Sequence, residues 1–280
     1  MNALEIHGLK KSYPGFALDI GELMLPEGTI LGLVGENGAG KSTTLRLILR
    51  LIRADAGTVT LLGRDERADF RAVKEDIGVV LDEVGIPGVT ARQLGRILSH
   101  AYRNWDHSAY DGLLRRLDVP TDKYFSDLSR GNKMKLGIAA AMSHHAKLLL
   151  LDEATNGLDP VVRDEVGEML FDFTRDPGHS VLISSHIVSD LEKLCDYIAF
   201  LHNGRILLCE EKDVLASEYG LLRCPAERLT ELAEGALLTR RVTAYGAEAI
   251  VRRDGVPAGT ELYPVGIEDI FVGMVKGEQV

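Results

Sequence analysis

A glycine-rich run that ends in a lysine and two hydroxyl residues is the strongest chemical signal in this sequence. The run GENGAGKST, residues 35–43, matches the phosphate-loop pattern G-x-x-x-x-G-K-[ST]. Glycines let backbone N–H groups converge on phosphate oxygens, and the N-terminus of a following helix adds positive potential. Lys41 adds a mobile charge for the β- and γ-phosphates, and Ser42 supplies a hydroxyl for Mg²⁺. The run therefore predicts a binding site for a nucleoside triphosphate.

The surroundings of this run support the same interpretation. An apolar strand-like segment, Thr29 to Val34, precedes it, and a helix-like segment, Ser42 to Leu51, follows it. The alternative, a glycine-rich turn with a chance lysine, does not require this strand–loop–helix context. The candidate nucleotide-binding residues of the loop are Gly35, Asn37, Gly38, Ala39, Gly40, Lys41, Ser42 and Thr43.

Two adjacent acids follow the bare apolar run LLLL. Asp152 and Glu153 would lie at the carboxyl edge of a buried strand, where open sheets place their ligand chemistry. Asp152 can reach the Mg²⁺ shell, and Glu153 can orient an attacking water and accept its proton. Alone, an apolar strand that ends in Asp-Glu is commonplace and is more often a solvated strand end. Beside a phosphate loop, it predicts hydrolysis of a phosphoanhydride.

Composition excludes several other classes of protein. The 280 residues are 45% hydrophobic and 26% charged, with a formal net charge of −10, which argues against a nucleic-acid binder. The longest apolar runs are far shorter than the roughly 20 residues that cross a bilayer. The start, MNALEIHGLKK, lacks the apolar segment of a signal peptide. Three cysteines without a CxxC pair are expected to be packing residues in a reducing cytoplasm.

Strand-like and helix-like segments alternate along the chain. This alternation predicts an α/β fold with a parallel sheet covered by helices on both faces. Residues from about 85 to 145 look helical, with a capping box at Thr90 and Gln93 and a second helix capped by Asp106. Asp159 and Pro160 fit the cap and first residue of a later helix. The other expected strands are Leu4 to Leu9, Ala17 to Leu25, Thr58 to Leu62, Ile77 to Leu81, Val181 to Ser184, and a hairpin from Tyr197 to Cys209 that turns at Asn203-Gly204.

A serine-led helix start shortly before the two acids carries the resemblance to a known family. LSRGN, residues 128–132, resembles the LSGGQ signature of ATP-binding cassette (ABC) ATPases. Further matches follow in family order: Tyr13 in KSYPG is similar to the A-loop aromatic, NGLD at 156–159 to the D-loop, and His186 to the switch histidine. The resemblance covers about residues 3 to 215.

The resemblance implies a fold and a division of the chain. We expect a P-loop NTPase (ABC ATPase) core over residues 1–215, with an antiparallel β subdomain and an α-helical subdomain at about 85–145. Residues 216–280 are expected to form a small C-terminal α+β extension. In it, Ala226 to Glu234 and Ile267 to Val275 look helical, and Thr239 to Ala244 and Glu248 to Arg253 look like strands.

The same resemblance implies roles for single residues. Two subunits would pair head to tail around two ATP molecules, and Ser129 with the backbone of Gly131 would bind the γ-phosphate held by the other subunit. Tyr13 would stack on adenine, although a Tyr before Pro-Gly is also an ordinary packed loop aromatic. His186 would hold the γ-phosphate and the lytic water together with Glu153. Asp159 would lie across the subunit interface and also cap its helix.

Some positions depart from the family pattern. Asp82 stands where the Q-loop has glutamine, so it would join Ser42 and Asp152 around Mg²⁺. Arg130 and Asn132 replace a Gly and the Gln of LSGGQ, and Ala154 replaces the usual Pro. These departures resemble the bacterial branch that pairs with ABC-2 type membrane subunits, often exporters.

The expected function is that of an ATP-hydrolysing subunit that drives transport through such a membrane partner. We expect it to pair with an identical or paralogous ATPase subunit on the cytoplasmic face of the membrane. The membrane partner would dock between Asp82 and Trp105. A soluble non-transport ABC ATPase and a nucleotide-sensing regulator remain alternatives. A GTPase is disfavoured because NKMK, residues 132–135, lacks the Asp of an NKxD motif.

Overall fold

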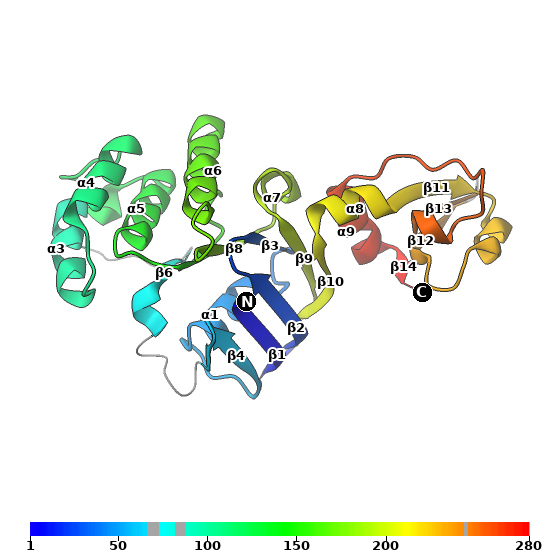
Figure 1. Cartoon of the computed structure of the whole chain (residues 1–280), viewed down its shortest axis with the longest axis horizontal. Coiled ribbons are helices and arrows are strands. Elements are labelled where there is room, and N and C mark those ends of the chain that lie inside the picture. Colours follow the sequence, from blue (N-terminus) through cyan, green and yellow to red (C-terminus); the bar gives the residue numbers. More distant parts are fainter. Residues whose placement is uncertain (66–72, 82–87, 244–245, 280) are drawn as a thin grey trace.

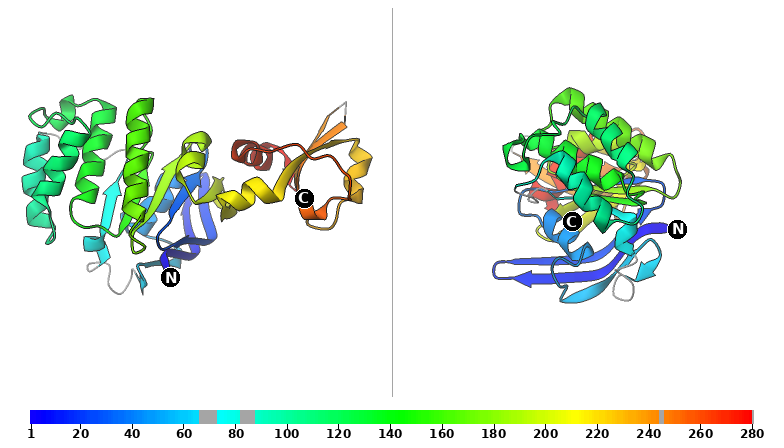
Figure 2. Two further views of the ribbon diagram at one scale, coloured as in Figure 1. Left: turned by 45° about the horizontal axis from the view of Figure 1, so that its top comes forward. Right: turned by 90° about the vertical axis from the view of Figure 1, so that its left-hand side faces the viewer.

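The computed structural model describes residues 1–65, 73–81, 88–243 and 246–279. Figure 1 shows an elongated molecule with a group of helices at one end, strands in the middle and the C-terminal residues at the other end. The second orientation in Figure 2 shows the same separation along the long axis. Within the described residues, no helix has the length and hydropathy needed to cross a membrane.

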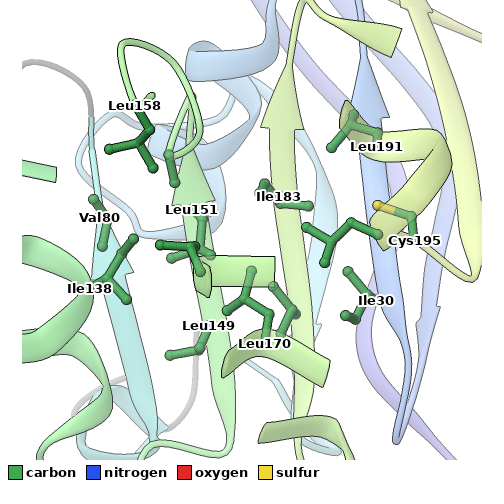
Figure 3. Packing of buried hydrophobic residues seen from close by; sticks show 14 of the residues in the cluster. Ile30, Val80, Ile138, Leu149, Leu151, Leu158, Leu170, Ile183, Leu191 and Cys195 are labelled. Atoms are coloured by element: carbon green, nitrogen blue, oxygen red, sulfur yellow. The ribbon is translucent and has the colours of Figure 1, made fainter. Parts of the chain in front are cut away.

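The central sheet has the strand order β10-β9-β3-β8-β7-β6. Neighbouring strands from β9 to β6 run parallel, and β10 is antiparallel to β9. Side chains alternate between the two faces: Leu149 and Leu151 pack toward the helices (Figure 3), and Leu148 and Leu150 pack against the other face. The prediction of a strand buried on both faces is therefore confirmed for β7. The strands are β3 (Ile30–Val34), β6 (Ile77–Val80), β7 (Leu148–Asp152), β8 (Ser180–Ser185), β9 (Tyr197–His202) and β10 (Arg205–Glu211).

An antiparallel sheet of order β2-β1-β4-β5 covers one face of the central sheet together with helix α1 (Lys41–Ile48). Its alternating apolar residues, such as Leu4 and Ile6, share a core with Leu31 and Leu33 of β3. Strand–helix alternation alone did not predict this layer, but the family resemblance did. The strands are β1 (Asn2–Tyr13), β2 (Phe16–Pro26), β4 (Ala56–Leu61) and β5 (Arg64–Asp65).

The helical subdomain lies beyond β6, at the end of the molecule where Figure 1 labels α3 and α4. Thr90 and Gln93 form the predicted capping box, and the Asp106 side chain accepts a hydrogen bond from the Ala109 amide. Ser129 caps α5 by accepting from the amide of Asn132. These local predictions are confirmed. The elements are α3 (Ala91–Ala101), α4 (His107–Arg116), the 3₁₀ turn η2 (Phe125–Asp127) and α5 (Arg130–Met142).

Helices α6 (Pro160–Thr174) and α7 (Val188–Leu194) pack on the same face of the central sheet as α5. Asp159 caps α6 through the amides of Val161 and Val162, as its sequence predicts. The β9–β10 hairpin turns through Asn203 and Gly204, whose φ angles are +46° and +78°. Two consecutive positive φ angles are those of a type I′ turn, the type that an Asn-Gly pair predicts.

The C-terminal residues form a third sheet, of order β11-β13-β12-β14, backed by helix α9 (Ile267–Lys276). The predicted helix from Ala226 to Glu234 is wrong in type, because the segment is a short 3₁₀ helix, η3 (Ala226–Glu231). No side chain caps the start of this segment, so its first turn lacks the hydrogen bond that favours an α-helix. The remaining elements are η1 (Lys74–Asp76), α8 (Lys212–Glu218), β11 (Tyr219–Cys224), β12 (Leu237–Thr243), β13 (Gly246–Arg252), η4 (Arg253–Gly255) and β14 (Glu278–Gln279).

Candidate nucleotide site

The glycine-rich loop joins the end of β3 to the start of α1, as the motif predicts. A Cβ atom at Gly35 would lie 2.5 Å from the carbonyl oxygen of Leu201, so a side chain there would collide with backbone. Gly40 has a φ of +113°, and a Cβ atom on it would lie 2.7 Å from Leu18. Both positions therefore require glycine for the loop to keep this course.

The loop borders a hollow of about 500 Å³. Backbone from the loop, the first turn of α1, and side chains that follow β7 and β8 meet around it. Its lining is mostly polar, as phosphate binding requires. The lining residues are Phe16, Glu36, Asn37, Gly38, Gly40, Lys41, Ser42, Thr43, Arg130, Glu153, Asn156 and His186.

Lys41 is buried at one side of this hollow and is held by three acceptors. Its Nζ donates to the carbonyl oxygens of Gly35 (2.7 Å) and Glu36 (3.2 Å). It also forms an ion pair with Glu153, with Nζ 3.2 Å from Oε1. The ammonium group is therefore fixed where loop and acidic strand end meet, close to the backbone amides that would share a phosphate with it.

Glu153 connects Lys41 to His186. Its second oxygen, Oε2, lies 2.8 Å from Nδ1 of His186. The Glu153 residue is buried, whereas the His186 side chain is 35% exposed. A carboxylate held in this way beside a lysine and a histidine can accept a proton from a water that attacks a bound phosphate. The structure thus brings together the three residues predicted to be catalytic.

Ser184, at the end of β8, orients both acids. Its Oγ donates to the Asp152 carboxylate (2.6 Å), and the Glu153 amide lies 3.2 Å from the same Oγ and 3.1 Å from the Ser184 carbonyl oxygen. These contacts hold Glu153 at a φ of +52°, which is unusual for a non-glycine residue. Sequence reasoning missed Ser184, although two serines ending the apolar run VLI are a signal for polar groups at this sheet edge.

Ser42 and Asp152, two of the predicted metal ligands, carry oxygen atoms of the kind that Mg²⁺ prefers. Ser42 lines the hollow, and the buried Asp152 carboxylate stands at the end of β7. Among the described residues, no cluster of three or more Asp, Glu, His or Cys side chains is present. Mg²⁺ in such sites needs only one or two protein ligands. Asp82, the third predicted metal ligand, lies outside the described residues.

Known proteins that are similar to this chain bind ATP, in agreement with the phosphate loop and the hollow beside it. The family model "ABC transporter" matches residues 18–156. The bacitracin transport ATP-binding protein BcrA of Enterococcus faecalis is 34% identical, over 66% of this chain and 61% of that protein. The daunorubicin/doxorubicin resistance ATP-binding protein DrrA of Streptomyces peucetius is 31% identical, over 95% of this chain and 86% of that protein. The chain belongs to the family of ABC transporter ATP-binding proteins.

A solved structure of the ATP-binding subunit of an ABC transporter also resembles this ABC ATPase. It is 27% identical, with a TM-score of 0.67, and the match covers 76% of this chain and 91% of that one. The unmatched part of this chain leaves room for an extension beyond the shared ATPase fold. Fold, family and ATP-hydrolysing activity therefore agree with the expectations from the sequence.

Several predicted residues lie outside the hollow of their own subunit. Ser129 and Asp159 are exposed helix caps, and neither is in the lining formed by the described residues. Gly131 lies against the D-loop segment, because a Cβ atom there would be 3.2 Å from the carbonyl oxygen of Gly157. Their predicted roles toward a second subunit stay predictions.

Phe16 lines the hollow with its aromatic ring, and sequence reasoning missed it. Tyr13, the predicted adenine-stacking residue, is 42% exposed at the end of β1, with Nζ of Lys11 5.6 Å from its ring centre. Tyr13 and Phe16 are paired across the β1–β2 hairpin, so one turn carries both rings. The signal for Phe16 was its place three residues after Tyr13 in KSYPGF.

Proposed function

We propose that this ABC ATPase is the energy-supplying subunit of an exporter and that it closes on a second ATPase subunit around two ATP molecules. The contacts of Glu153 with Lys41 and His186 support this proposal. They place a cation that can bind phosphate beside a carboxylate that can accept a proton from water. The relatives named for bacitracin transport and for daunorubicin resistance support export as the direction of transport.

Each residue of the site has a distinct part in the proposed hydrolysis. The loop amides and Lys41 hold the β- and γ-phosphates, and Ser42 with Asp152 would hold Mg²⁺, which offsets phosphate charge when bound. Glu153 orients a water molecule and accepts its proton on a carboxylate oxygen as the water oxygen bonds to the γ-phosphorus. The bond to the bridging oxygen breaks, leaving ADP and phosphate. His186 keeps the Glu153 carboxylate aligned.

A second subunit completes each site in this proposal. The first turn of α5 contains no acidic residue, so its backbone N–H groups and the Ser129 hydroxyl are suited to an anion. We infer that this helix start binds the γ-phosphate held by the other subunit, with Gly131 allowing close approach and Asp159 reaching across. Tyr13 would meet the adenine. An identical subunit and a paralogue both satisfy these requirements.

An apolar cleft of about 290 Å³ between α3, α5 and β6 supports a docking place for the membrane subunit. Val80, Leu98, Tyr102 and Met134 contribute to its lining. His144 also lines it, and burial lowers the pKa of this histidine, which favours its neutral form. We propose that a cytoplasmic helix of an ABC-2 type membrane subunit inserts apolar side chains here.

This docking would place the protein peripherally on the cytoplasmic face of the membrane. The cleft overlaps the expected docking region of residues 82–105, of which residues 82–87 lie outside the described part of the chain. We further propose that residues 1–215 form the ATPase domain and that residues 216–280 form an accessory extension.

The proposed function can be tested by measuring the ATPase rate and the ATP-dependent pairing of the Glu153→Gln variant. The variant loses the base, so its ATPase rate should fall by about 100-fold or more. It should still bind ATP and pair, as measured by sedimentation. Adding Ser129→Arg should abolish that pairing because it blocks the helix start. Glu168→Gln, at an exposed position on α6, is the control and should hydrolyse ATP normally. Equal rates for Glu153→Gln and wild type would contradict the proposal.

A further inference from the structure

A buried acid in the first turn of α7 joins the two segments that supply Glu153 and His186. Asp190 follows His186 by four residues, and its side chain is 7% exposed. Its Oδ2 accepts a hydrogen bond from the hydroxyl of Thr155 (3.2 Å), a buried residue that follows Glu153 by two positions. The segments after β7 and β8 are therefore held together at a second point, in addition to the contact between Glu153 and His186.

Arg163 of α6 extends this arrangement to the segment that resembles the D-loop. Its Nη1 donates to Oδ1 of Asp190 (2.9 Å), and its Nη2 donates to the carbonyl oxygen of Leu158 (3.2 Å). The guanidinium compensates the charge of the buried carboxylate, and its planar shape fixes the direction of both bonds. Both oxygens of Asp190 are thus engaged, and residues 155–158 are tied to the start of α7.

We propose that Asp190 is a positioning residue that keeps Glu153 aligned with His186 during hydrolysis. This inference rests on the function proposed above. A base must lie within about 3 Å of the proton that it accepts, so a small displacement of its segment lowers the rate. Asp190, Thr155 and Arg163 are all absent from the lining that the described residues form around the hollow. Loss of Asp190 should therefore affect the chemical step and leave ATP affinity nearly unchanged.

Steady-state ATP hydrolysis by the full chain separates positioning from a purely structural role. Asp190→Asn keeps the size of the side chain and removes the charge that faces Arg163. The kcat should fall by about tenfold, and the KM for ATP should change by less than about twofold. Each variant is assayed at a temperature at which circular dichroism shows it folded. If Asp190 only stabilised the packing of α6 and α7, the variant would unfold at a lower temperature and keep its kcat.

The Thr155 hydroxyl offers a second pair of variants that leaves the ion pair intact. Thr155→Val removes the hydrogen bond at nearly constant volume, so kcat should fall by about threefold to tenfold. Thr155→Ser keeps a hydroxyl and should retain at least about half of the wild-type kcat. Asp172→Asn is the matched control, because it also turns an acid of an ion pair into its amide, here at an exposed position of α6 beside Arg175. Its kcat should equal that of wild type.

A double variant with His186 shows whether Asp190 acts through the alignment of the site. In His186→Ala the partner of Glu153 is absent, so adding Asp190→Asn should lower the single-turnover rate by less than about twofold. A tenfold loss that persists in His186→Ala would overturn the proposal, and so would wild-type kcat in both Asp190→Asn and Thr155→Val.

Glu153→Gln separates this inference from the proposed function. Hydrolysis at the wild-type rate in Glu153→Gln would refute the proposed function itself. Slow hydrolysis in Glu153→Gln together with wild-type kcat in Asp190→Asn would refute only the role of Asp190.

Discussion

Glu153 is the residue on which the geometry of the site converges. Its two carboxylate oxygens contact Lys41 and His186, and its backbone is held by Ser184 at a positive φ angle. The Lys41 and Glu153 side chains are 5% and 10% exposed, so each relies on the other for charge compensation. A phosphate at Lys41 would compete for the same ammonium group, which couples nucleotide binding to the position of the base.

The mutual stabilisation of Lys41 and Glu153 can be measured by unfolding variants of the protein in the absence of nucleotide. Lys41→Met leaves the buried Glu153 carboxylate with His186 as its remaining side-chain partner, so stability should fall by about 2–4 kcal/mol. In Lys41→Met/Glu153→Gln the carboxylate that Lys41 paired with is also absent, and the loss should be at least about 1 kcal/mol smaller than the sum of the single losses. Urea titration of wild type, Lys41→Met, Glu153→Gln and the double variant gives the coupling free energy between the two side chains. Strict additivity would show that the ion pair contributes nothing to the fold.

Residue types and spacing predicted the centre of the site but not all of its surroundings. The phosphate loop and the Asp152-Glu153 pair are recognisable because each is contiguous in sequence and has a chemical reason for its order. Ser184 and Phe16 come from β8 and β2, and their approach to the loop depends on strand order in two sheets. No local pattern encodes such long-range neighbours, which is why both were missed.

At the scale of elements, sequence predicted best where a local hydrogen-bond signal exists. Thr90, Asp106, Ser129 and Asp159 all cap the helices that their positions predicted. The segment after Pro225 has no such cap, and it folds as a 3₁₀ helix. Strand order in the central sheet, with β3 between β8 and β9, could not be read from the sequence because it depends on packing between distant segments.

The cleft beside α3 allows a matched test of membrane-subunit docking. Leu98 lines the cleft, whereas its neighbour Ile97 is 51% exposed on the same helix. Leu98→Asp should prevent co-purification with the ABC-2 type subunit, because an apolar helix would have to desolvate the new charge. Ile97→Asp should leave co-purification intact. ATPase activity of the isolated subunit serves as the folding control and should survive both changes.

A second measurement follows the same docking in solution. Trp105 is the only tryptophan in the sequence, and its ring lies 6.5 Å from Tyr102 of the cleft lining. Its fluorescence should change when the purified membrane subunit is added to wild type or Ile97→Asp, and not when it is added to Leu98→Asp. Equal co-purification and equal fluorescence changes for both variants would place the docking surface elsewhere.

At the scale of the whole molecule, the last helix ties the C-terminal sheet to the ATPase core. The Gly273 carbonyl oxygen of α9 accepts a hydrogen bond from the Thr239 hydroxyl of β12 (2.8 Å). From the same helix, the Phe271 ring lies 5.3 Å from the ring of Phe200 on β9. Buried residues of α9 therefore belong to the same apolar cluster as the central sheet. Although sequence predicted this helix well, its docking onto β9 was invisible because one amphipathic face fits many partners.

Truncation of Phe271 measures how strongly this helix holds the molecule together. Phe271 is 8% exposed, so Phe271→Ala should cost about 3–5 kcal/mol of stability by opening a cavity against Phe200. Val272 is 41% exposed on the same helix, and Val272→Ala is the control, with an expected loss within about 0.5 kcal/mol. Thermal unfolding gives the difference, and limited proteolysis should show faster cleavage within residues 219–279 for Phe271→Ala only. Similar stability and cleavage of the two variants would mean that the C-terminal sheet folds without support from the ATPase core.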